Sequence, residues 1–451
     1  MTDPTEMSGA PSVYARRTTL AAAAILCISI TARAQEIIAS EYGPSPNLPA
    51  PHKSILTTVK IAKAVGWPEN AKPRAAPGIV VDAYARDLDH PRWLYVLPNG
   101  DVLVAETDAP PKPDDSKGIS GKVHKLLMKR AGSGTRPSPN RIILLRGLSA
   151  DASAPERHVF LQGLNSPFGM ALIGESLYVA DTDAVLRFPY HAGDVEIRAQ
   201  PTTVVDLPAG TINHHWTKSL IASLDGHKLY VGVGSNSNAA ENGLDVERDR
   251  AAVWQIDVAT GDHRVFASGL RNPNGLAWEP DDGVLWVAVN ERDALGDQLP
   301  PDYMTGLRDG AFYGWPYSYY GQHVDVRVKP QDSDMVAKAI PPQYALGAHT
   351  ASLGLCWSDG SKLPTQLQHG MFIGQHGSWN RKTRSGYEVV FVPFDHGQPA
   401  GLPVVVLNGF LDSHGDAMGR PVGVAIDKQG ALLVADDVGN TIWRVTSASG
   451  R

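Results

Sequence analysis

The stretch Pro98-Asn99-Gly100-Asp101-Val102-Leu103-Val104-Ala105-Glu106 decides the fold. It joins an Asn-Gly turn to a short apolar strand that ends on an acidic residue. Such a turn between apolar runs is a signal for a β-hairpin, because both of its residues tolerate the positive φ that tight turns require. Related stretches recur at 174–181, 225–231, 282–288 and 429–436. The chain therefore contains a repeating series of short antiparallel strands.

The spacing of these repeats indicates the architecture. They recur about every fifty to a hundred residues, and a poorer sixth copy fits 371–374 with 387–391. Helical periodicity is almost absent, and repetition of this kind is typical of propeller blades. We therefore predict an all-β, six-bladed β-propeller of four-stranded antiparallel blades, with long inserted loops at 108–121, 235–249 and 292–340. A β-sandwich or a two-domain β protein is the alternative.

The N-terminal residues have the features of an export signal. Arg16 and Arg17 precede an apolar run at 20–30, and Ala32-Arg33-Ala34 has the small-x-small pattern of a cleavage site. The run is too short for a spanning helix, although a retained anchor is the alternative. We predict an export signal at 1–34, an irregular arm at 35–77 packed on the outside, and a single propeller domain at 78–451. The mature protein would be periplasmic or secreted, exported by the general or the twin-arginine route, without stable membrane insertion.

Charge and cysteine content exclude several classes of function. The formal net charge is −6, and the chain has no basic stripe that would bind nucleic acid or an anionic membrane. Cleavage of the signal would remove Cys27 and leave Cys356 as the only thiol. No internal disulfide and no covalently attached c-type haem can then form. Any electrons that the protein takes up must therefore leave to a separate acceptor.

Two stretches carry the residues of a candidate redox site. The first is His-His-Trp-Thr-Lys-Ser-Leu at 214–220, and the second is Gly-Leu-Arg-Asn-Pro-Asn-Gly-Leu-Ala-Trp at 269–278. A neutral His215 at the start of a strand would be a general base near pH 7, although a surface or metal-bridging histidine is the alternative. Arg271 stays protonated and can polarise a quinone oxygen where negative charge develops. Asn272 can fix the plane of such a cofactor.

These stretches, together with Phe-Tyr-Gly-Trp-Pro at 312–316, resemble the soluble sugar dehydrogenases that depend on pyrroloquinoline quinone (PQQ). That family consists of six-bladed propellers that oxidise aldoses and related sugars. The likeness is greatest to its sorbosone dehydrogenase branch, through Val-Gly-Ser-Asn-Ser-Asn at 233–238, Asn-Glu-Arg-Asp at 290–293 and Gly-Ser-Trp-Asn-Arg at 377–381. The resemblance runs from about Gly78 to Val445 and so covers nearly the whole mature chain.

The resemblance implies roles for the matching residues. His215 matches the base that takes the proton from the substrate hydroxyl while a hydride moves to the quinone. Arg271 and Asn272 match the pair that contacts the quinone oxygens. We therefore expect His215 and Arg271 to be catalytic and Asn272 to bind the cofactor. His349 and His376 lie in loops that would reach the same site, and are further candidates for cofactor binding unless they only cap those loops.

The cofactor carboxylates are expected to bind arginine, which can form paired hydrogen bonds with them. Arg420 matches a family arginine at such a carboxylate, but Val422 stands where some members carry a second one. One carboxylate is therefore short of a partner. Arg381 is the candidate replacement in cofactor binding, with Lys382 as the alternative.

The resemblance also implies a calcium ion (Ca2+) that withdraws electrons from the quinone ring. Calcium takes oxygen ligands, and backbone carbonyls of an irregular loop suffice. In the family these carbonyls come from the loop that matches 292–294, so Asp293 and Ala294 are the candidate metal ligands. The alternative is that the acidic residues of this loop only keep it solvated.

These observations predict a PQQ-dependent oxidoreductase that oxidises a sugar or a sugar aldehyde and passes the electrons to an external cytochrome or quinone. Nicotinamide is not expected to replace PQQ, because no Gly-x-Gly-x-x-Gly follows a strand. Two alternatives stay open. One is a calcium-dependent lactonase of the gluconolactonase kind, and the other is a non-catalytic propeller that binds glycans or proteins.

Overall fold

The computed structural model describes residues 39–52, 58–111, 137–147, 154–360 and 362–448. The predicted export signal at 1–34 lies outside these residues, as does most of the loop predicted at 108–121. Nearly all elements of the described part are β-strands, and its one α-helix is α2 (Ser333–Lys338). No helix among the described elements is both long and apolar enough to cross a membrane.

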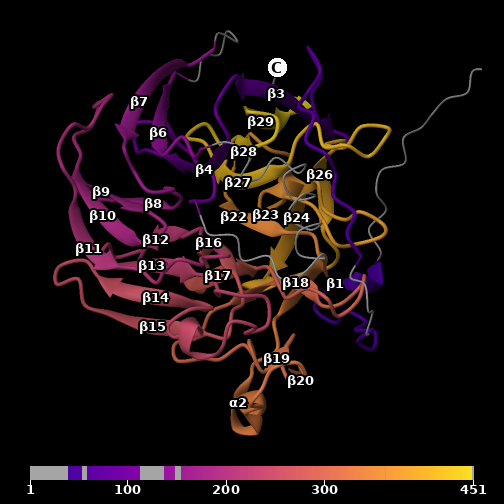
Figure 1. Ribbon diagram of the computed structural model, residues 1–451. Helices are drawn as coiled ribbons and strands as arrows, with labels where there is room; N and C mark the ends of the chain where they lie inside the picture. The colour runs from indigo at the N-terminus through magenta and orange to yellow at the C-terminus, as the bar shows by residue number, and fades with distance from the viewer. Residues whose placement is uncertain (1–38, 53–57, 112–136, 148–153, 361, 449–451) are drawn as a thin grey trace, which may run out of the picture. The chain divides into compact units, whose positions relative to one another are not determined.

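Six antiparallel sheets form the blades of a β-propeller, which confirms the predicted fold class (Figure 1). We number the blades along the chain. Blade 1 consists of β4 (Pro91–Val96), β5 (Val102–Glu106), β6 (Arg141–Arg146) and β7 (Glu156–Gln162). Blade 2 consists of β8 (Met170–Ile173), β9 (Ser176–Ala180), β10 (Ala184–Pro189) and β11 (Thr202–Asp206). Blade 3 consists of β12 (Leu220–Ala222), β13 (Lys228–Val233), β14 (Ala252–Asp257) and β15 (His263–Ser268).

The other three blades use strands from both ends of the chain. Blade 4 consists of β16 (Pro273–Glu279), β17 (Val284–Val289), β18 (Pro301–Gly306) and β21 (Tyr344–Ala348), with β1 (Tyr42–Gly43) on its outer edge. Blade 5 consists of β22 (Ser352–Ser358), β23 (Gly370–Gln375), β24 (Glu388–Asp395) and β26 (Val404–Asn408), with β2 (Arg74–Ala75) outside them and β25 (Gln398–Pro399) paired to β24. Blade 6 consists of β27 (Pro421–Ile426), β28 (Leu432–Asp436), β29 (Thr441–Ser447) and β3 (Ile79–Ala85). The propeller closes there, because its first strand, β3, pairs with its last, β29 (Figure 1).

The first strand of each blade is the innermost one, and neighbouring inner strands contact one another around the axis. Glycine makes this approach sterically possible: a Cβ at Gly169 would lie only 2.1 Å from the backbone nitrogen of Leu220. Apolar side chains on or just before five inner strands pack into one buried cluster, namely Trp93, Phe168, Trp216, Leu353 and Val422. The axis of the propeller is therefore filled by packed side chains near the beginning of the inner strands.

The insertion predicted at 292–340 differs from the observed one. It contains β18, which is the third strand of blade 4 and not a loop. This strand was missed because Pro301, Asp302 and Thr305 interrupt the apolar run that marks the other strands. The rest of the segment is a true insertion, which carries β19 (Ser318–Tyr319), β20 (His323–Val324) and α2 and projects from blade 4 (Figure 1).

The N-terminal arm also differs from the expectation that it packs only on the outside. Its strands β1 and β2 do pair with the outer strands of blades 4 and 5. Between them, however, Ala62 is fully buried, and its carbonyl oxygen accepts a hydrogen bond from Arg420. Glu41, at the start of the arm, is also buried. The arm therefore contacts the candidate site described below.

Candidate active site

One end of the propeller collects the residues that the sequence singled out. Within each blade the first two strands are antiparallel, so the loop before the inner strand and the loop after the second strand lie at the same end. We refer to this end as the mouth, formed by residues 86–90, 163–169, 207–219, 269–272, 349–351 and 409–420 and by the loops after the second strands. The predicted residues of the mouth are His215, Arg271, Asn272, Asp293, Ala294, His349, His376, Arg381 and Arg420.

His215 is oriented by the end of β13. Its Nδ1 lies 2.8 Å from the carbonyl oxygen of Ser235 and 2.9 Å from the hydroxyl oxygen of the same residue. A carbonyl oxygen can only accept, so Nδ1 carries the ring proton and Nε2 keeps its lone pair. No hydrogen bond within the described part of the chain uses Nε2. The imidazole therefore has the tautomer and the open nitrogen that a general base requires.

The surroundings of His215 keep it neutral. Burial and the positive charge of Arg271 hold the pKa of His215 well below its ordinary value, and they outweigh the opposing effects of Ser235 and Asp293. The base is therefore unprotonated at pH 7, as its predicted role requires.

Asn272 lies beside His215. A Cβ at Gly234 would lie 2.4 Å from the Cβ of His215 and 2.6 Å from Oδ1 of Asn272, so both side chains pack on this glycine. The Oδ1 atom of Asn272 is buried and has no hydrogen-bond partner in the described part of the chain. Buried polar atoms are nearly always bonded, so this side chain is available to a ligand.

Arg271 is held by five hydrogen bonds. Its Nε donates to the Asn238 carbonyl oxygen (3.2 Å), and its Nη1 donates to the carbonyl oxygens of Asn290 (3.3 Å) and Glu291 (2.7 Å). Its Nη2 donates to Oδ1 of Asn238 (3.0 Å) and to Oδ2 of Asp293 (3.1 Å). A guanidinium has five N–H groups, so all of its donors are engaged. Arg271 therefore acts on the site through its charge and by fixing this loop, and a direct bond to a ligand would require one of the five to break.

Asp293 and His349 are bound to each other and to Asn380. The Asp293 carboxylate accepts from Nδ2 of Asn380 (2.7 Å) and lies 3.7 Å from Nδ1 of His349, whose Nε2 donates to the Gly296 carbonyl oxygen (2.8 Å). Burial alone would raise the pKa of Asp293, but Arg271 and His349 lower it to about 2. The carboxylate is therefore ionised, and these side chains form a fixed wall of the mouth.

A second charged group lies between blades 6 and 1, centred on Asp437. Its Oδ2 is 2.9 Å from Nε2 of His376, 3.6 Å from Nη1 of Arg92 and 3.8 Å from Nε2 of His90. Burial would raise the pKa of Asp437, but these three groups hold it well below its usual range. Burial also lowers the pKa of His376 to about 4, aided by the charges of Arg420 and Arg92, although Asp437 opposes the shift.

Two arginines of this group have unused donors. The Nε atoms of Arg92 and Arg420 are buried and have no partner in the described part of the chain. Arg92 also lies over the ring of Trp216, with 5.5 Å from Cζ to the ring centroid, and this tryptophan follows His215 directly. Arg92 therefore lies next to the residue that follows the base, and Arg420 stands at the same end of the propeller as His215.

Arg381 has a different partner from the predicted one. Its Nη1 and Nη2 donate to the two carboxylate oxygens of Glu41, at 2.8 and 2.7 Å, and Nη1 also donates to the Ala348 carbonyl oxygen. Both side chains are buried. This arrangement favours a structural role for Arg381, which anchors the N-terminal arm, and weighs against a role in binding cofactor carboxylates.

The Arg381–Glu41 pair should therefore matter for stability. Replacing Arg381 with Met removes the cation from the buried Glu41 carboxylate and leaves it the neutral donor Nε2 of Gln298 (3.1 Å), so it should lower the free energy of unfolding by about 3–5 kcal/mol. The double variant Arg381→Met/Glu41→Met should recover most of that loss, because no charge is left unpaired. Urea denaturation measures both, with Lys60→Met as the control for an exposed charge on the arm. A single variant as stable as wild type would show that the pair does not anchor the arm.

Sequence reasoning missed Arg92, Asp437, Asn238 and Glu41. A signal for Arg92 was present, because His90-Pro91-Arg92 begins an inner strand with proline, as Asn272-Pro273 and Arg420-Pro421 do. Asp437 and Asn238 follow the second strands of their blades at the mouth. Glu41 carries no local signal, since it pairs with a residue 340 positions away.

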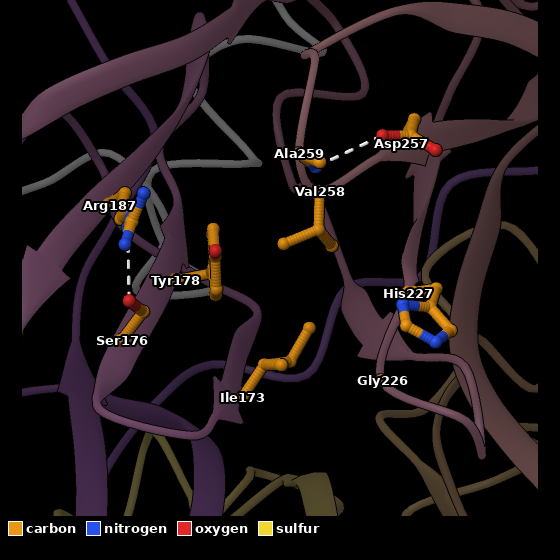
Figure 2. A pocket seen from close by; sticks show the side chains of 9 residues that line it. All are labelled: Ile173, Ser176, Tyr178, Arg187, Gly226, His227, Asp257, Val258 and Ala259. Carbon is orange, nitrogen blue, oxygen red and sulfur yellow. Dashed lines mark hydrogen bonds between the residues drawn. The ribbon is translucent and has the colours of Figure 1, made fainter.

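A separate cavity of about 390 Å³ lies at the opposite end of blades 2 and 3 (Figure 2). It is formed where β8 turns into β9, where β12 turns into β13, and where β14 ends. It is lined by Ile173, Ser176, Tyr178, Arg187, Gly226, His227, Asp257, Val258 and Ala259. None of the predicted site residues is among them, so we do not assign the predicted chemistry to this cavity.

Comparison with known proteins connects the chain to a family. The TrAA12-like family model matches residues 149–301 and 319–448, which is well over half of the chain. An uncharacterized protein of Borreliella burgdorferi is 30% identical over 241 residues, which is 53% of this chain and 62% of that protein. The chain therefore spans less than two thirds of the length of this curated relative.

Solved structures share the fold. The holo PQQ domain of pyranose dehydrogenase from Coprinopsis cinerea gives a TM-score of 0.67 at 19% identity, covering 86% of this chain and 100% of that one. The calcium structure of carbohydrate-active enzyme family AA12 from Trichoderma reesei gives 0.66 at 18% identity, covering 87% and 99%. The predicted resemblance is confirmed at the level of the family, while these comparisons do not single out a sorbosone branch. The chain belongs to the TrAA12-like family.

Proposed function

We propose that the protein is a PQQ-dependent dehydrogenase that oxidises a sugar or a sugar aldehyde, such as an aldose or a sorbosone-like substrate. The electrons would pass to an external cytochrome or quinone. One observation carries this proposal: a neutral His215 with an open Nε2 lies at the mouth with Asn272 and Arg420, and Arg92 lies over the ring of the next residue, Trp216. Oδ1 of Asn272 and Nε of both arginines are buried without partners in the described part of the chain. The export signal expected at 1–34 supports a periplasmic or secreted location.

The residues present fit a planar quinone that carries carboxylates. The free Nε donors of Arg92 and Arg420 suit carboxylates, because arginine binds them with paired, charge-assisted hydrogen bonds. The side-chain amide of Asn272, beside His215, would donate from Nδ2 to a quinone oxygen, because its Oδ1 can only accept. When bound, PQQ supplies an acceptor for two electrons from the substrate carbon. Arg92 would thus take the role in carboxylate binding that we expected of Arg381.

His215 would provide the proton transfer. Its Nε2 would accept the proton of the substrate hydroxyl, while Nδ1 remains bound to the Ser235 carbonyl oxygen. The positive charge of Arg271 would stabilise negative charge that develops near Asn272. The likeness to the PQQ domain of pyranose dehydrogenase supports PQQ as the cofactor. A lactonase would have no need for two arginines with free donors beside a neutral base.

The residues present do not fit the expected calcium ion. The Asp293 carbonyl oxygen already accepts from Nη1 of Arg327 (2.9 Å) and from Nδ2 of Asn238 (3.3 Å), and Arg271 occupies the carbonyls of Asn290 and Glu291. A calcium ion at the Asp293 carbonyl oxygen would have to displace the guanidinium of Arg327 or the amide of Asn238, and would lie near Arg271, which has the same sign of charge. Ala294, the other expected ligand, has a φ of 68°.

PQQ binding should therefore be insensitive to calcium. We expect the dissociation constant of PQQ to change less than about twofold between buffers with EDTA and with millimolar calcium chloride, because arginines supply the positive charge of this loop. Fluorescence titration measures this, and calorimetry of the apoprotein with calcium chloride alone serves as a second test. Saturable calcium binding that tightens PQQ would contradict the prediction and restore the metal site at Asp293 and Ala294.

The proposed activity is tested by a dye-reduction screen. Apoprotein reconstituted with PQQ should reduce an artificial dye with at least one substrate from a panel of aldoses, osones and simple alcohols. Turnover with aldoses is compared with turnover with osones, because one base and one quinone can oxidise either a sugar or a sugar aldehyde. Equal turnover with nicotinamide in place of PQQ would contradict the proposal.

A further inference from the structure

A buried lysine lies next to the proposed base without a carboxylate partner. Lys218 stands two residues before β12, and its side chain is 0% exposed. Its Nζ lies 3.2 Å from the carbonyl oxygen of Trp216 and 3.4 Å from that of His215. No ion pair in the described part of the chain includes this ammonium group. Burial of an unpaired charge costs free energy, so its presence calls for a reason.

The fold does not require a lysine at this place. In blade 2 the residue two positions before the inner strand is Phe168, which is fully buried among aromatic side chains. In blade 5 the residue two positions before the inner strand is Thr350, which is fully buried and uncharged. Uncharged side chains thus fill the corresponding positions of blades 2 and 5.

What Lys218 contacts is the turn that carries the base. The Trp216 carbonyl oxygen also accepts from Oγ1 of Thr182 (2.9 Å), which in turn accepts from Nδ2 of Asn213 (2.9 Å). Nη1 of Arg250 donates to the Asn213 side chain (3.0 Å). Buried donors therefore hold two consecutive carbonyl oxygens, those of His215 and Trp216.

We infer that Lys218 is a positioning residue, which holds the His215–Trp216 turn so that Nε2 of His215 faces the proposed cofactor site. The functional half of this inference rests on the proposed function. The structural half, that Lys218 orients His215 at a cost in stability, stands on the contacts alone.

The charge state of Lys218 adds a pH dependence. Burial lowers its pKa to about 7, aided by the charge of Arg250 and opposed by Asp183. In the unfolded chain the group keeps its ordinary value of 10.5. Between these values the unfolded state binds more protons, so this group makes the wild type more stable as pH rises through that window. The cost of the buried charge is therefore greatest below about pH 7.

The test compares wild type with Lys218→Met, using Lys228→Met on the same blade as the control. Lys218→Met should raise Tm most below pH 7, with a gain that shrinks toward pH 9, while kcat of the PQQ-loaded protein falls by up to about a hundredfold with unchanged PQQ affinity. Lys228→Met should change neither. A fall in kcat that accompanies a lower Tm would show a merely structural role, and wild-type kcat would overturn the inference.

An NMR titration of the His215 ring separates this inference from the proposed function. In Lys218→Met the imidazole should lose its fixed bond to Ser235, and its pKa should move up toward the ordinary value, whether or not PQQ is present. An unchanged His215 titration in this variant would overturn the positioning role. Failure of wild type to bind PQQ, with a shifted His215 titration in the variant, would overturn the proposed function alone.

Discussion

Replacing His215 with alanine is expected to lower kcat of the PQQ-loaded protein by about a hundred- to ten-thousand-fold, the usual contribution of a general base. The reason is that Nε2 of His215 is the open, unprotonated nitrogen at the mouth, with Nδ1 committed to Ser235. PQQ affinity should change little, because the cofactor is held by other residues. Steady-state dye reduction at saturating PQQ, with a separate PQQ titration, measures both quantities.

The neighbouring histidine and the pH profile provide controls. His214→Ala should reduce kcat far less, since His214 is exposed. Because the pKa of His215 is held well below 6.5, the base stays neutral on acidification, and kcat/KM should fall only at pH values well below 6.5. A larger effect of His214→Ala, or a fall in kcat/KM centred at pH 6.5 or above, would contradict the assignment of the base.

Replacing Arg92 or Arg420 with alanine should weaken PQQ binding by about 1.5–3 kcal/mol, which is roughly ten- to 150-fold in the dissociation constant. Each arginine offers a buried Nε that has no partner among the described residues, so each should donate to a cofactor carboxylate. At saturating PQQ, kcat should be largely restored, because these residues bind the cofactor and do not take part in proton transfer. Fluorescence titration of the apoproteins measures the affinities.

Arg381→Met is the matched control for these two variants. Its guanidinium is committed to Glu41, so the folded fraction of this variant should bind PQQ with wild-type affinity despite its lower stability. The opposite pattern, a stable Arg381→Met protein with weakened PQQ affinity and unaffected Arg92→Ala binding, would restore Arg381 as the carboxylate partner.

The propeller was predictable because its strands share a local signal. A glycine turn followed by an apolar run marks the second strand of each of the six blades, such as β5, β17 and β28. β18 has no such run, since Pro301 and Asp302 open it, and it was assigned to a loop. The closing strand β3 lies far in sequence from β29, with which it pairs, and pairing over that distance leaves no local pattern.

The site was predictable where a residue stands directly before an inner strand. Arg271, Asn272 and Arg420 all do so, and strand direction then brings them to one end. The partners of these residues were not predictable, because they come from other blades or from the arm. Asn238 and Asp293 accept hydrogen bonds from Arg271, and Glu41 binds Arg381. Each of these contacts depends on tertiary structure that no motif encodes.

The most direct test of the central claim is an equilibrium titration of purified apoprotein with PQQ, followed by the quinone absorbance in the presence of EDTA. We expect saturable binding of one PQQ per chain, weakened in Arg92→Ala and Arg420→Ala and unchanged in His215→Ala. The absence of saturable PQQ binding by a folded wild-type protein, with or without added calcium, would contradict the account.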